Sequence, residues 1–311
     1  MVAVIVFFFI ACSALFSACP SRTESLSPTA TGSISTLSDS FRTYWYSGVA
    51  EITTYRLNQA RYGEIHPGTA TLIFVTEPFS LSKQVKTDNP DAANPDHISV
   101  LKLNACARFI TGIYPYATML SVFQPVDVLQ HPLALKSAAS VQEWCGISYA
   151  QRNLRSGRYE EKSFSYFESE GDQNRIHESC WLEDALWTLI RINPEVAPVG
   201  RHRLLPGSIY HRLSHQPAQP QWANLRRELR NNDKVDYYIE YEQLRRSLVI
   251  TYEKNFPHRI RGWVETYPGF DGRLLASVAV ADQTLRTDYW NHHLPDDRAL
   301  RKQLNLPEDW Q

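Results

Sequence analysis

The chain lacks the charge excess and the short motifs that mark several large classes of protein. Its 32 basic residues are balanced by 33 acidic ones, which gives a net charge of −1. A nucleic-acid partner requires a basic field to neutralise phosphates, so we expect none. The sequence has no GxSxG motif, no phosphate-binding loop and no GxGxxG fingerprint. It therefore carries no sequence signal of an α/β-hydrolase, a P-loop NTPase or a dinucleotide-binding enzyme.

Cysteine is also scarce. Beyond the N-terminal region the chain has only Cys106, Cys145 and Cys180, and it has no CxxC pair. This excludes zinc-ribbon and thioredoxin-like sites. An oxidising compartment would permit one disulfide among the three and leave one thiol free, and the pairing stays open. We interpret all three as small, buried apolar residues.

The one long apolar run is at the N-terminus. Val2 to Leu15 (VAVIVFFFIACSAL) has the length of a signal-peptide core and is too short to span a bilayer comfortably. The following Phe16-Ser17-Ala18-Cys19 resembles the lipobox of bacterial lipoproteins, in which the cysteine is acylated and becomes the new N-terminus. We therefore predict a lipoprotein signal peptide over residues 1–19 and a lipid anchor at Cys19 that holds the protein on a membrane of the cell envelope. The alternative is an ordinary cleaved signal peptide without a lipid.

The segment after Cys19 is polar. Pro20 to Ser40 is rich in serine and threonine and has no aromatic residue. Such a segment cannot bury enough apolar surface to offset the entropy lost on ordering. We predict a flexible tether over residues 20–42 that spaces the domain from the membrane.

The remainder shows mostly the pattern of β-strands, with aromatic and β-branched residues in short runs bounded by glycine, proline, asparagine and aspartate. The predicted strands span residues 43–57, 70–76, 99–103, 107–126, 141–149, 159–168, 203–213, 235–241, 246–253, 260–267 and 274–284. The strands 235–241 and 246–253 are predicted to form a hairpin that turns at residues 242–245. Regularly spaced short strands indicate an antiparallel meander.

Two segments have helical spacing. Ser179 to Ile192 places apolar residues on one face, with Ser179 as a candidate N-cap and Pro194 as a stop. Trp222 to Arg230 is a second, more charged candidate. The predicted fold is mainly β, a large curved antiparallel sheet or open barrel with one or two accessory helices. We expect a single domain over residues 43–290 and a polar tail over 291–311.

The candidate catalytic and metal-binding residues do not assemble into a motif. His211 and His215 would share a strand face, but neither this pair nor His177 nor the adjacent His292 and His293 has an evident third ligand, so we predict no metal site. The strand-like segment after Tyr166 would place three carboxylates on one face: Glu168, Glu170 and Asp172. Glycosidases and calcium sites use such groups, although a solvated strand face gives the same pattern.

The most distinctive motif is Gln142-Glu143-Trp144-Cys145-Gly146. On a strand, Trp144 would point away from Glu143 and Cys145 and would bury one face of the strand, and Gly146 would leave room for close approach on the tryptophan side. Glu143 would lie among apolar neighbours and would need an arginine or a backbone amide as partner. We predict a structural role, with Glu143 paired and Cys145 buried and unreactive.

Several segments together resemble a family of lipoproteins of diderm bacteria, over most of the chain from about Tyr44 to Trp290. The matching segments are Tyr44-Trp45-Tyr46, Ala50-Glu51-Ile52, Gln59-Ala60-Arg61-Tyr62-Gly63-Glu64, Thr76-Glu77, Lys83-Gln84-Val85-Lys86, Val100-Leu101-Lys102-Leu103-Asn104, Thr111-Gly112-Ile113-Tyr114-Pro115-Tyr116, Ser140-Val141-Gln142-Glu143-Trp144-Cys145-Gly146 and Ser165-Tyr166-Phe167-Glu168. Members are often labelled "septum formation inhibitor Maf". Maf proteins themselves are cytosolic nucleotide pyrophosphatases with an α/β fold, and this chain lacks their N-terminal Ser-x-Ser-Pro-Arg-Arg motif.

We regard that label as transferred. What the resemblance implies is a place in the envelope of a diderm bacterium, lipid-anchored to its inner or outer membrane. It implies no established activity, so no catalytic residue is carried over from the family.

The sequence leaves three hypotheses for function. The leading one is a non-enzymatic envelope lipoprotein that binds a lipid or another apolar ligand, because a curved sheet with a covering helix can cradle such a molecule. The second is an envelope hydrolase that uses Glu168, Glu170 and Asp172. The third is a Maf-type nucleotide pyrophosphatase, which the missing motif disfavours. We predict no cofactor, and the membrane is the one macromolecular partner that the sequence indicates.

Overall fold

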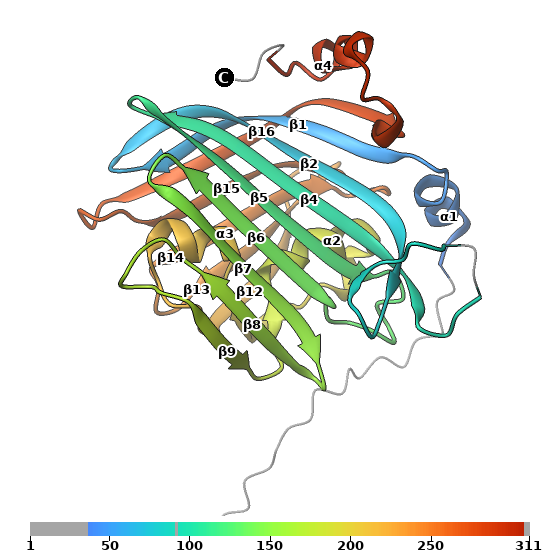
Figure 1. Cartoon of the computed structure of the whole chain (residues 1–311), viewed down its shortest axis with the longest axis horizontal. Helices are drawn as coiled ribbons and strands as arrows, with labels where there is room; N and C mark the ends of the chain where they lie inside the picture. The colour runs from blue at the N-terminus through green and yellow to red at the C-terminus, as the bar shows by residue number, and fades with distance from the viewer. Residues whose placement is uncertain (1–36, 91–92, 308–311) are drawn as a thin grey trace, which may run out of the picture. The chain divides into compact units, whose positions relative to one another are not determined.

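Strands make up most of the described chain and pair into one sheet. The computed structural model describes residues 37–90 and 93–307, so the predicted signal peptide, Cys19 and the tether up to Thr36 lie outside the described residues. The 16-stranded sheet has the order β10-β11-β12-β13-β14-β15-β16-β1-β2-β4-β5-β6-β7-β8-β9, and β3 pairs with β2 (Figure 1). The predicted mainly β fold with a large antiparallel sheet is confirmed.

The strands in the first half of the chain are β1 (Ala50–Arg61), β2 (Glu64–Ser80), β3 (Val85–Lys86), β4 (His97–Thr111), β5 (Tyr114–Pro125), β6 (Lys136–Glu143), β7 (Gly146–Arg155), β8 (Arg158–Phe164) and β9 (Gln173–His177). Those in the second half are β10 (Trp181–Leu182), β11 (Gly200–Leu205), β12 (Gln221–Leu229), β13 (Lys234–Tyr241), β14 (Arg246–Glu253), β15 (Ile260–Pro268) and β16 (Leu274–Thr287).

The sheet is a meander whose two halves join where β16 pairs with β1, with Ala50 opposite Thr287. Neighbouring strands are antiparallel throughout, apart from the short parallel pair β10–β11. The edge strands are β9 and β10, which follow one another in sequence but are not neighbours in the order of the described strands. The sheet is therefore curved but open. The predicted hairpin of β13 and β14 is confirmed, with Tyr241 opposite Arg246.

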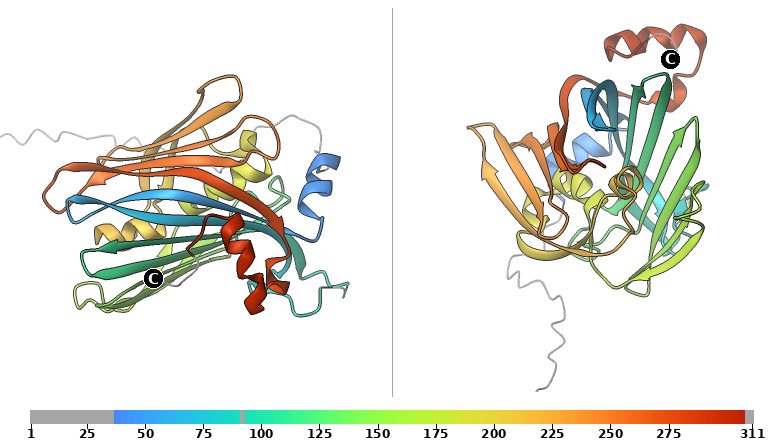
Figure 2. Two further views of the ribbon diagram at one scale, coloured as in Figure 1. Left: turned by 90° about the horizontal axis from the view of Figure 1, so that it is seen from above. Right: turned by 90° about the vertical axis from the view of Figure 1, so that its left-hand side faces the viewer.

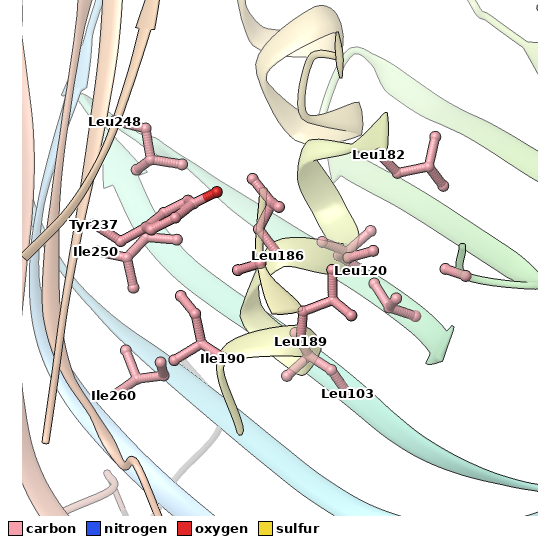
Figure 3. Close-up of a cluster of buried hydrophobic side chains, with 14 of the residues drawn as sticks. Leu103, Leu120, Leu182, Leu186, Leu189, Ile190, Tyr237, Leu248, Ile250 and Ile260 are labelled. Carbon is pink, nitrogen blue, oxygen red and sulfur yellow. The ribbon is translucent and has the colours of Figure 1, made fainter. Parts of the chain in front are cut away.

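The core lies on the concave side of the sheet, around helix α2 (Glu183–Ile192) (Figure 2). Figure 3 shows Leu189 of α2 beside Leu103 and Leu120 of one part of the sheet, and Ile190 facing Ile260 of the other. A helix that is buried on nearly all sides belongs in a core. The helix therefore fills the space between the two halves of the sheet.

The helix predicted over residues 179–192 is confirmed over most of its length, but it begins at Glu183. Trp181 and Leu182 form β10 instead, opposite Leu204 and Leu205 of β11. The parallel pairing holds this segment extended, so Leu182 and not Ser179 is the N-cap residue. Pro194 lies just past the helix and opens a short 3₁₀ turn, η1 (Pro194–Val196).

The N-terminal helix α1 (Asp39–Trp45) was not expected. Residues 39–42 were assigned to the tether, and 43–45 to a strand. Ser38 caps the helix by accepting a hydrogen bond from the Phe41 backbone N–H at 3.2 Å. Phe41 and Trp45 are four residues apart, so they share one helix face and are both buried against the core. Burial of these two side chains stabilises the helix, although the residues beside them are mostly polar.

Two further predictions were wrong. Residues 222–230 were expected to form a helix but lie in β12, between β11 and β13. There Ala223 and Leu225 are buried at the strand period of two. The charged residues of the segment had suggested a solvent-exposed helix instead. Residues 203–213, expected to be one strand, divide into β11 and helix α3 (Ser208–Ser214), because Pro206-Gly207 ends the strand.

The C-terminal part contains η2 (Tyr289–Asn291), η3 (Pro295–Arg298) and α4 (Ala299–Gln303). Leu304 is buried, and its carbonyl accepts a hydrogen bond of 2.8 Å from Thr54 Oγ1, so this part of the predicted tail docks on β1. Among the described residues, no helix is long and apolar enough to cross a bilayer.

Candidate functional site

One end of the sheet gathers six hairpin connections. In an antiparallel meander alternate turns lie at the same end, and here these join β1–β2, β4–β5, β6–β7, β8–β9, β13–β14 and β15–β16. Helix α3 lies at this end too, because it follows the end of β11 and precedes the start of β12. We call it the collar end.

The turns at the collar end carry large apolar side chains. The β4–β5 turn exposes 83% of Ile113, the β6–β7 turn 68% of Trp144, the β8–β9 connection 65% of Tyr166, and the β15–β16 turn 67% of Phe270. Tight hairpin turns usually consist of glycine, asparagine and aspartate, which suit the backbone and solvent. Exposed apolar groups gathered at one place mark a surface that contacts something else.

Aromatic rings at this end form a chain of contacts, which we call the aromatic collar. Its members are Tyr62, Tyr114, Trp144, Tyr166, Phe167, His215 and Phe270. Ring centroids lie 6.4 Å apart for Tyr114–Trp144, 6.3 Å for Tyr62–Phe270, 5.7 Å for His215–Phe270, 5.4 Å for Phe167–His215 and 5.4 Å for Tyr166–Phe167.

Two further contacts complete the collar. The Tyr62 and Tyr114 hydroxyls are hydrogen-bonded at 2.9 Å. On the other side, the Tyr166 ring covers Gly146, where a Cβ atom would come within 2.5 Å of it. Gly146 therefore leaves room for close approach, as the sequence predicts, and the group that approaches is Tyr166. Tyr166 therefore packs on the first residue after the turn that contains Trp144.

The predicted motif around Glu143 is a turn and not a continuous strand. Glu143 pairs with Gly146 across the two residues Trp144 and Cys145. Both turn residues are exposed, so the predictions that Trp144 buries a strand face and that Cys145 is buried are wrong. The hairpin turn places Trp144 and Cys145 beyond the last backbone pair of the sheet, where no neighbouring strand can cover them.

Glu143 nevertheless has the arginine partner that the sequence predicts. Its Oε1 accepts a hydrogen bond of 2.7 Å from Arg212 Nη2 of α3, and both side chains are largely buried. Arg212 also donates from Nε to Ser148 Oγ at 2.9 Å and lies 4.5 Å from the Phe167 ring centroid. The motif therefore joins α3 to the inside of the collar.

The three predicted acidic residues do not form a cluster. Residues 168–172 lie in the connection between β8 and β9, where Glu168 and Asp172 are exposed. Only Glu170 turns inward, and its Oε1 lies 2.6 Å from Nδ1 of His215. The strand alternation that would align them ends at Phe164. The described residues contain no group of three or more side chains that could hold a metal ion.

The candidate histidines also lie in different places. His211 is in α3 and His215 is its C-terminal cap, so the two share a helix end and not a strand face. His177 is buried 3.5 Å from Glu161. His292 and His293 are far along the C-terminal segment, where His292 contacts Asp288 and Asp297. Burial, followed by the nearby Arg152 charge, holds the pKa of His211 well below its usual range.

Two pockets flank α3 at the collar end. The arginine pocket, about 270 Å³, is lined by Arg152, Arg175 and Arg212 among others. The tyrosine pocket, about 390 Å³, is lined by Tyr62, Tyr210 and Tyr267. Gln216 and other residues at the end of α3 border one or both. These volumes are close to the lower end of the range of small-molecule sites.

The interior of the sheet has less room. A cavity of about 130 Å³, lined by Trp187 and Leu248 but also by charged residues such as Arg246, lies between the helices and the sheet. It is smaller than an engineered cavity that holds one benzene ring. Because α2 fills the concave side, the cradle that the sequence analysis assigns to an apolar ligand is largely occupied by the protein itself.

Buried ion pairs fix α3 beneath the collar. Arg152 Nε donates to Glu161 at 2.8 Å, and its Nη1 lies 3.2 Å from Asp184 at the start of α2. Asp184 in turn accepts hydrogen bonds from the backbone and hydroxyl groups of Ser208, the first residue of α3. Burial alone would raise the pKa of Glu161, but Arg152 and His177 outweigh it and hold the pKa well below its usual range.

A second arginine stabilises the other side of α3. Arg61 donates a hydrogen bond to the Leu213 carbonyl. Its guanidinium carbon lies 4.4 Å from the Tyr62 ring centroid and 5.7 Å from that of Phe270. Sequence reasoning missed Arg61, Arg212, Phe270 and α3. The sequence pattern that could have indicated these residues is an aromatic residue beside glycine in a turn, as in Tyr62-Gly63. This pattern marks single turns but does not show which turns lie side by side in the fold.

Comparisons with known proteins leave the family open. Neither a protein-family model nor a curated protein matches the sequence. Among solved structures, the chain is similar to the crystal structure of a β-barrel-like protein of the domain of unknown function DUF1849 from Brucella abortus, with a TM-score of 0.45 and 9% identity over 77% of this chain and 98% of that one. The resemblance to lipoproteins labelled Maf stays a prediction.

Proposed function

We propose that the protein is a lipoprotein of the cell envelope that binds an amphiphilic ligand at the collar end and catalyses no reaction. The observation that carries the proposal is that the aromatic collar borders the two pockets that flank α3: Tyr62 and Phe270 line the tyrosine pocket, and His215 lines the arginine pocket. Aromatic rings offer apolar contact, and the pockets beneath offer polar side chains. A ligand with both kinds of surface fits this arrangement better than a purely apolar molecule.

The polar part of such a ligand is expected to be uncharged. In the arginine pocket, Arg152 and Arg175 both contact Glu161, and Arg212 contacts Glu143 and Glu170. Each guanidinium is already paired with a carboxylate, so a charged group entering the pocket would lose hydration without gaining a free counter-ion. Serine hydroxyls at the same wall can both donate and accept hydrogen bonds, and they suit a hydroxylated group.

The hydrolase alternative has less support. Glu161 and Glu170 both line the arginine pocket, but a carboxyl group that acts as a general acid needs a raised pKa, and that of Glu161 is lowered. His215 contacts Glu170, yet Arg212 Nη1 lies 3.3 Å from its Nε2. Among the described residues, no serine or cysteine forms a hydrogen bond with His215.

Membrane attachment is tested by replacing Cys19. Acylation requires the thiol, so Cys19→Ala should move the protein from the membrane fraction to the soluble fraction. Wild-type protein that already fractionates as soluble would contradict the lipoprotein part of the proposal. A matched Cys12→Ala variant, which changes a cysteine within the apolar run, should stay in the membrane fraction.

Ligand binding is tested first by native mass spectrometry of protein extracted from its own membranes, which should show a co-purifying small molecule. The head group is tested with octyl glucoside, octyl phosphate and octyltrimethylammonium below their micelle concentrations, because the three share one tail. We expect octyl glucoside to bind at least tenfold more tightly than either octyl phosphate or octyltrimethylammonium. Equal binding of all three would contradict an uncharged site, and absence of any ligand or probe would overturn the proposal.

A collar variant links the binding to this end of the molecule. Phe270→Ala removes an exposed ring that contacts Tyr62 and His215, and it should weaken octyl glucoside binding about tenfold, or about 1.4 kcal/mol. Trp290→Ala, an exposed ring of η2 that is not a collar member, is the matched control and should leave binding unchanged.

A further inference from the structure

The collar-end turns present apolar groups at positions where solvent-exposed turns are normally polar. Three of them contain only two residues each, because Arg61 pairs with Glu64, Thr111 with Tyr114 and Glu143 with Gly146. These turns contain Tyr62, Ile113 and Trp144. Their tips project beyond the paired strands, so neighbouring strands of the sheet cannot shield these side chains.

Two of the three collar tyrosines, Tyr62 and Tyr114, pair their hydroxyl groups within the protein. The Tyr62 hydroxyl lies 2.9 Å from that of Tyr114 and 2.7 Å from that of Tyr116. A surface that meets hydrocarbon must satisfy its hydrogen bonds internally, whereas a surface that meets a polar partner leaves them free. Pairing lowers the cost of placing the Tyr62 and Tyr114 hydroxyls in an apolar environment, and aromatic rings are enriched at the interface between a bilayer and water.

The charges at these turns indicate which kind of surface fits. No lysine lies in the collar-end turns; Glu64, Glu168 and Asp172 contribute exposed carboxylates there, and Arg245 of the β13–β14 turn contributes an exposed guanidinium. Arg273 is exposed but is paired with Asp271 at 2.5 Å. Proteins that bind anionic lipids present clusters of lysine and arginine. A slightly acidic rim instead favours a bilayer whose head groups carry no net charge.

The chain outside the described residues is long enough to permit such a contact. The described chain begins with α1, and β1 then runs from Ala50 to the collar end at Arg61, so the two lie at opposite ends of this strand (Figure 1). A strand of 12 residues spans about 40 Å. Residues 20–36 can extend to about 60 Å. An anchor at Cys19 would therefore allow the collar to reach the membrane that holds the anchor.

We propose that the aromatic collar is a membrane-docking surface that inserts its turn tips into the head-group region of a bilayer with no net charge. Ile113, Trp144 and Phe270 enter from three separate turns, while Arg61 and Arg212 stabilise α3 behind them. Docking places the entrances of the two pockets against the lipid, so an amphiphile can exchange between pocket and bilayer without crossing water. The docking itself does not depend on ligand binding.

The test uses the chain from Pro20 onward, which lacks the proposed anchor and keeps every described residue. The buried hydrophobic residues that form its core lie between Phe41 and Leu304, so this chain retains the whole core. In a Cys106→Ser background, an environment-sensitive dye on the exposed Cys145 reports from a collar turn, and Cys180 is buried. The matched control carries the dye at Ser156→Cys in a Cys145→Ser background, in the β7–β8 turn at the opposite end.

With phosphatidylcholine vesicles, the dye at Cys145 should shift to shorter wavelength, and the dye at residue 156 should not. The protein should float with these vesicles equally well in 0.5 M salt, and adding phosphatidylglycerol should not strengthen binding. Ile113→Ser with Phe270→Ser should reduce flotation at least tenfold. Leu129→Ser, an exposed apolar residue in the loop between β5 and β6, should not change it.

Three results would overturn the docking proposal. One is an absence of binding to phosphatidylcholine vesicles. Another is binding that needs phosphatidylglycerol and disappears in salt, which would indicate electrostatic attraction. The third is a dye shift that depends on protein concentration without vesicles, which would assign the collar to a second copy of the chain. If the protein binds octyl glucoside but does not bind vesicles, the docking proposal is refuted and the proposal of ligand binding stands.

Discussion

The two ends of the sheet use the same kind of tight turn with opposite side chains. At the collar end, Gly112-Ile113 and Trp144-Cys145 connect their strands, while Ser156-Gly157 makes the corresponding connection at the other end. Each connection spans two residues, so the backbone does not require a large apolar side chain. The exposed rings at the collar end therefore need a reason other than folding, and contact with a ligand and a membrane supplies one.

The opposite end also has aromatic residues: it buries Phe41 and Trp45 of α1, while Tyr46 and Trp290 are each 46% exposed. Phe41 of α1 packs there against Trp45 and Phe256. The guanidinium carbon of Arg191 lies 4.9 Å from the ring centroid of Trp45. Arg191 forms a two-pronged ion pair with Glu51 at 2.6 and 2.8 Å. The difference between the ends lies in their tight turns: those at the collar end expose Ile113 and Trp144, whereas the Ser156-Gly157 turn has no apolar side chain.

The largest effect on stability is expected from breaking the buried pair at the opposite end. Arg191→Met leaves the Glu51 carboxylate buried without its main partner, which should lower the free energy of unfolding by about 3–5 kcal/mol. Chemical denaturation measures this directly. Adding Glu51→Gln to the variant should recover part of the loss, and a single variant as stable as the parent would contradict the account.

Acid should weaken the same kind of interaction. Burial alone would raise the pKa of Glu51, but Arg191, Tyr44 and Arg259 outweigh it and lower the pKa. Glu161 behaves in the same way with Arg152. A carboxyl group with a lowered pKa in the folded state contributes stability above its unfolded pKa of about 4.5 and loses it as the pH falls. The melting temperature should therefore decline progressively below about pH 4.5.

Calorimetry between pH 7 and pH 3 measures that decline. Glu168→Gln, which changes an exposed carboxylate at the collar end, should leave the profile unchanged. A melting temperature that is constant down to pH 3 would show that the buried pairs contribute little to stability.

Glu143 should have an intermediate effect, because it lies at the collar end but is buried. Glu143→Ala leaves Arg212 without its shortest carboxylate contact and should cost about 1.5–3 kcal/mol. It should also weaken octyl glucoside binding, because Arg212 lines the arginine pocket. Glu143→Gln retains one hydrogen-bond acceptor, so its thermal shift should be smaller; an equal shift would assign the effect to lost packing instead.

The exposed turn should be nearly neutral for stability. Trp144→Ala should change the free energy of unfolding by less than about 0.5 kcal/mol, in contrast to Arg191→Met. The neighbouring Cys145 should react rapidly with a thiol reagent in the folded protein. Cys180 should react slowly, because burial raises the pKa of its thiol to about 11. Peptide mass mapping after timed labelling distinguishes the two, and slow labelling of Cys145 would contradict its exposed position.

The sequence predicted the parts of the fold that depend on local periodicity. Helix α2 follows from apolar residues at helical spacing, and the hairpin of β13 and β14 follows from alternation around a polar turn. The arginine partner of Glu143 followed from the cost of leaving a buried carboxylate unpaired. The helix and the hairpin depend on residues that are close in sequence, and the partner of Glu143 depends on the need of one buried carboxylate for a hydrogen bond.

The collar could not be predicted because its contacts join distant segments. Tyr62 meets Phe270, and Phe167 meets His215, only after the meander has brought several turns to one end. Period-two alternation also does not show where a strand stops. The motif at Gln142 to Gly146 was therefore interpreted as a strand interior, although the chain reverses at Trp144 and Cys145.

Hydrogen exchange tests most directly the claim that the protein makes its contacts at the collar end. Exchange would be followed by mass spectrometry with and without vesicles prepared from the membranes of the source cell. The account predicts that protection increases in the turns at residues 62–63, 112–113, 144–145 and 269–273, and stays unchanged at 156–157 and 230–233. Protection confined to the latter turns, or no change at either end, would contradict it.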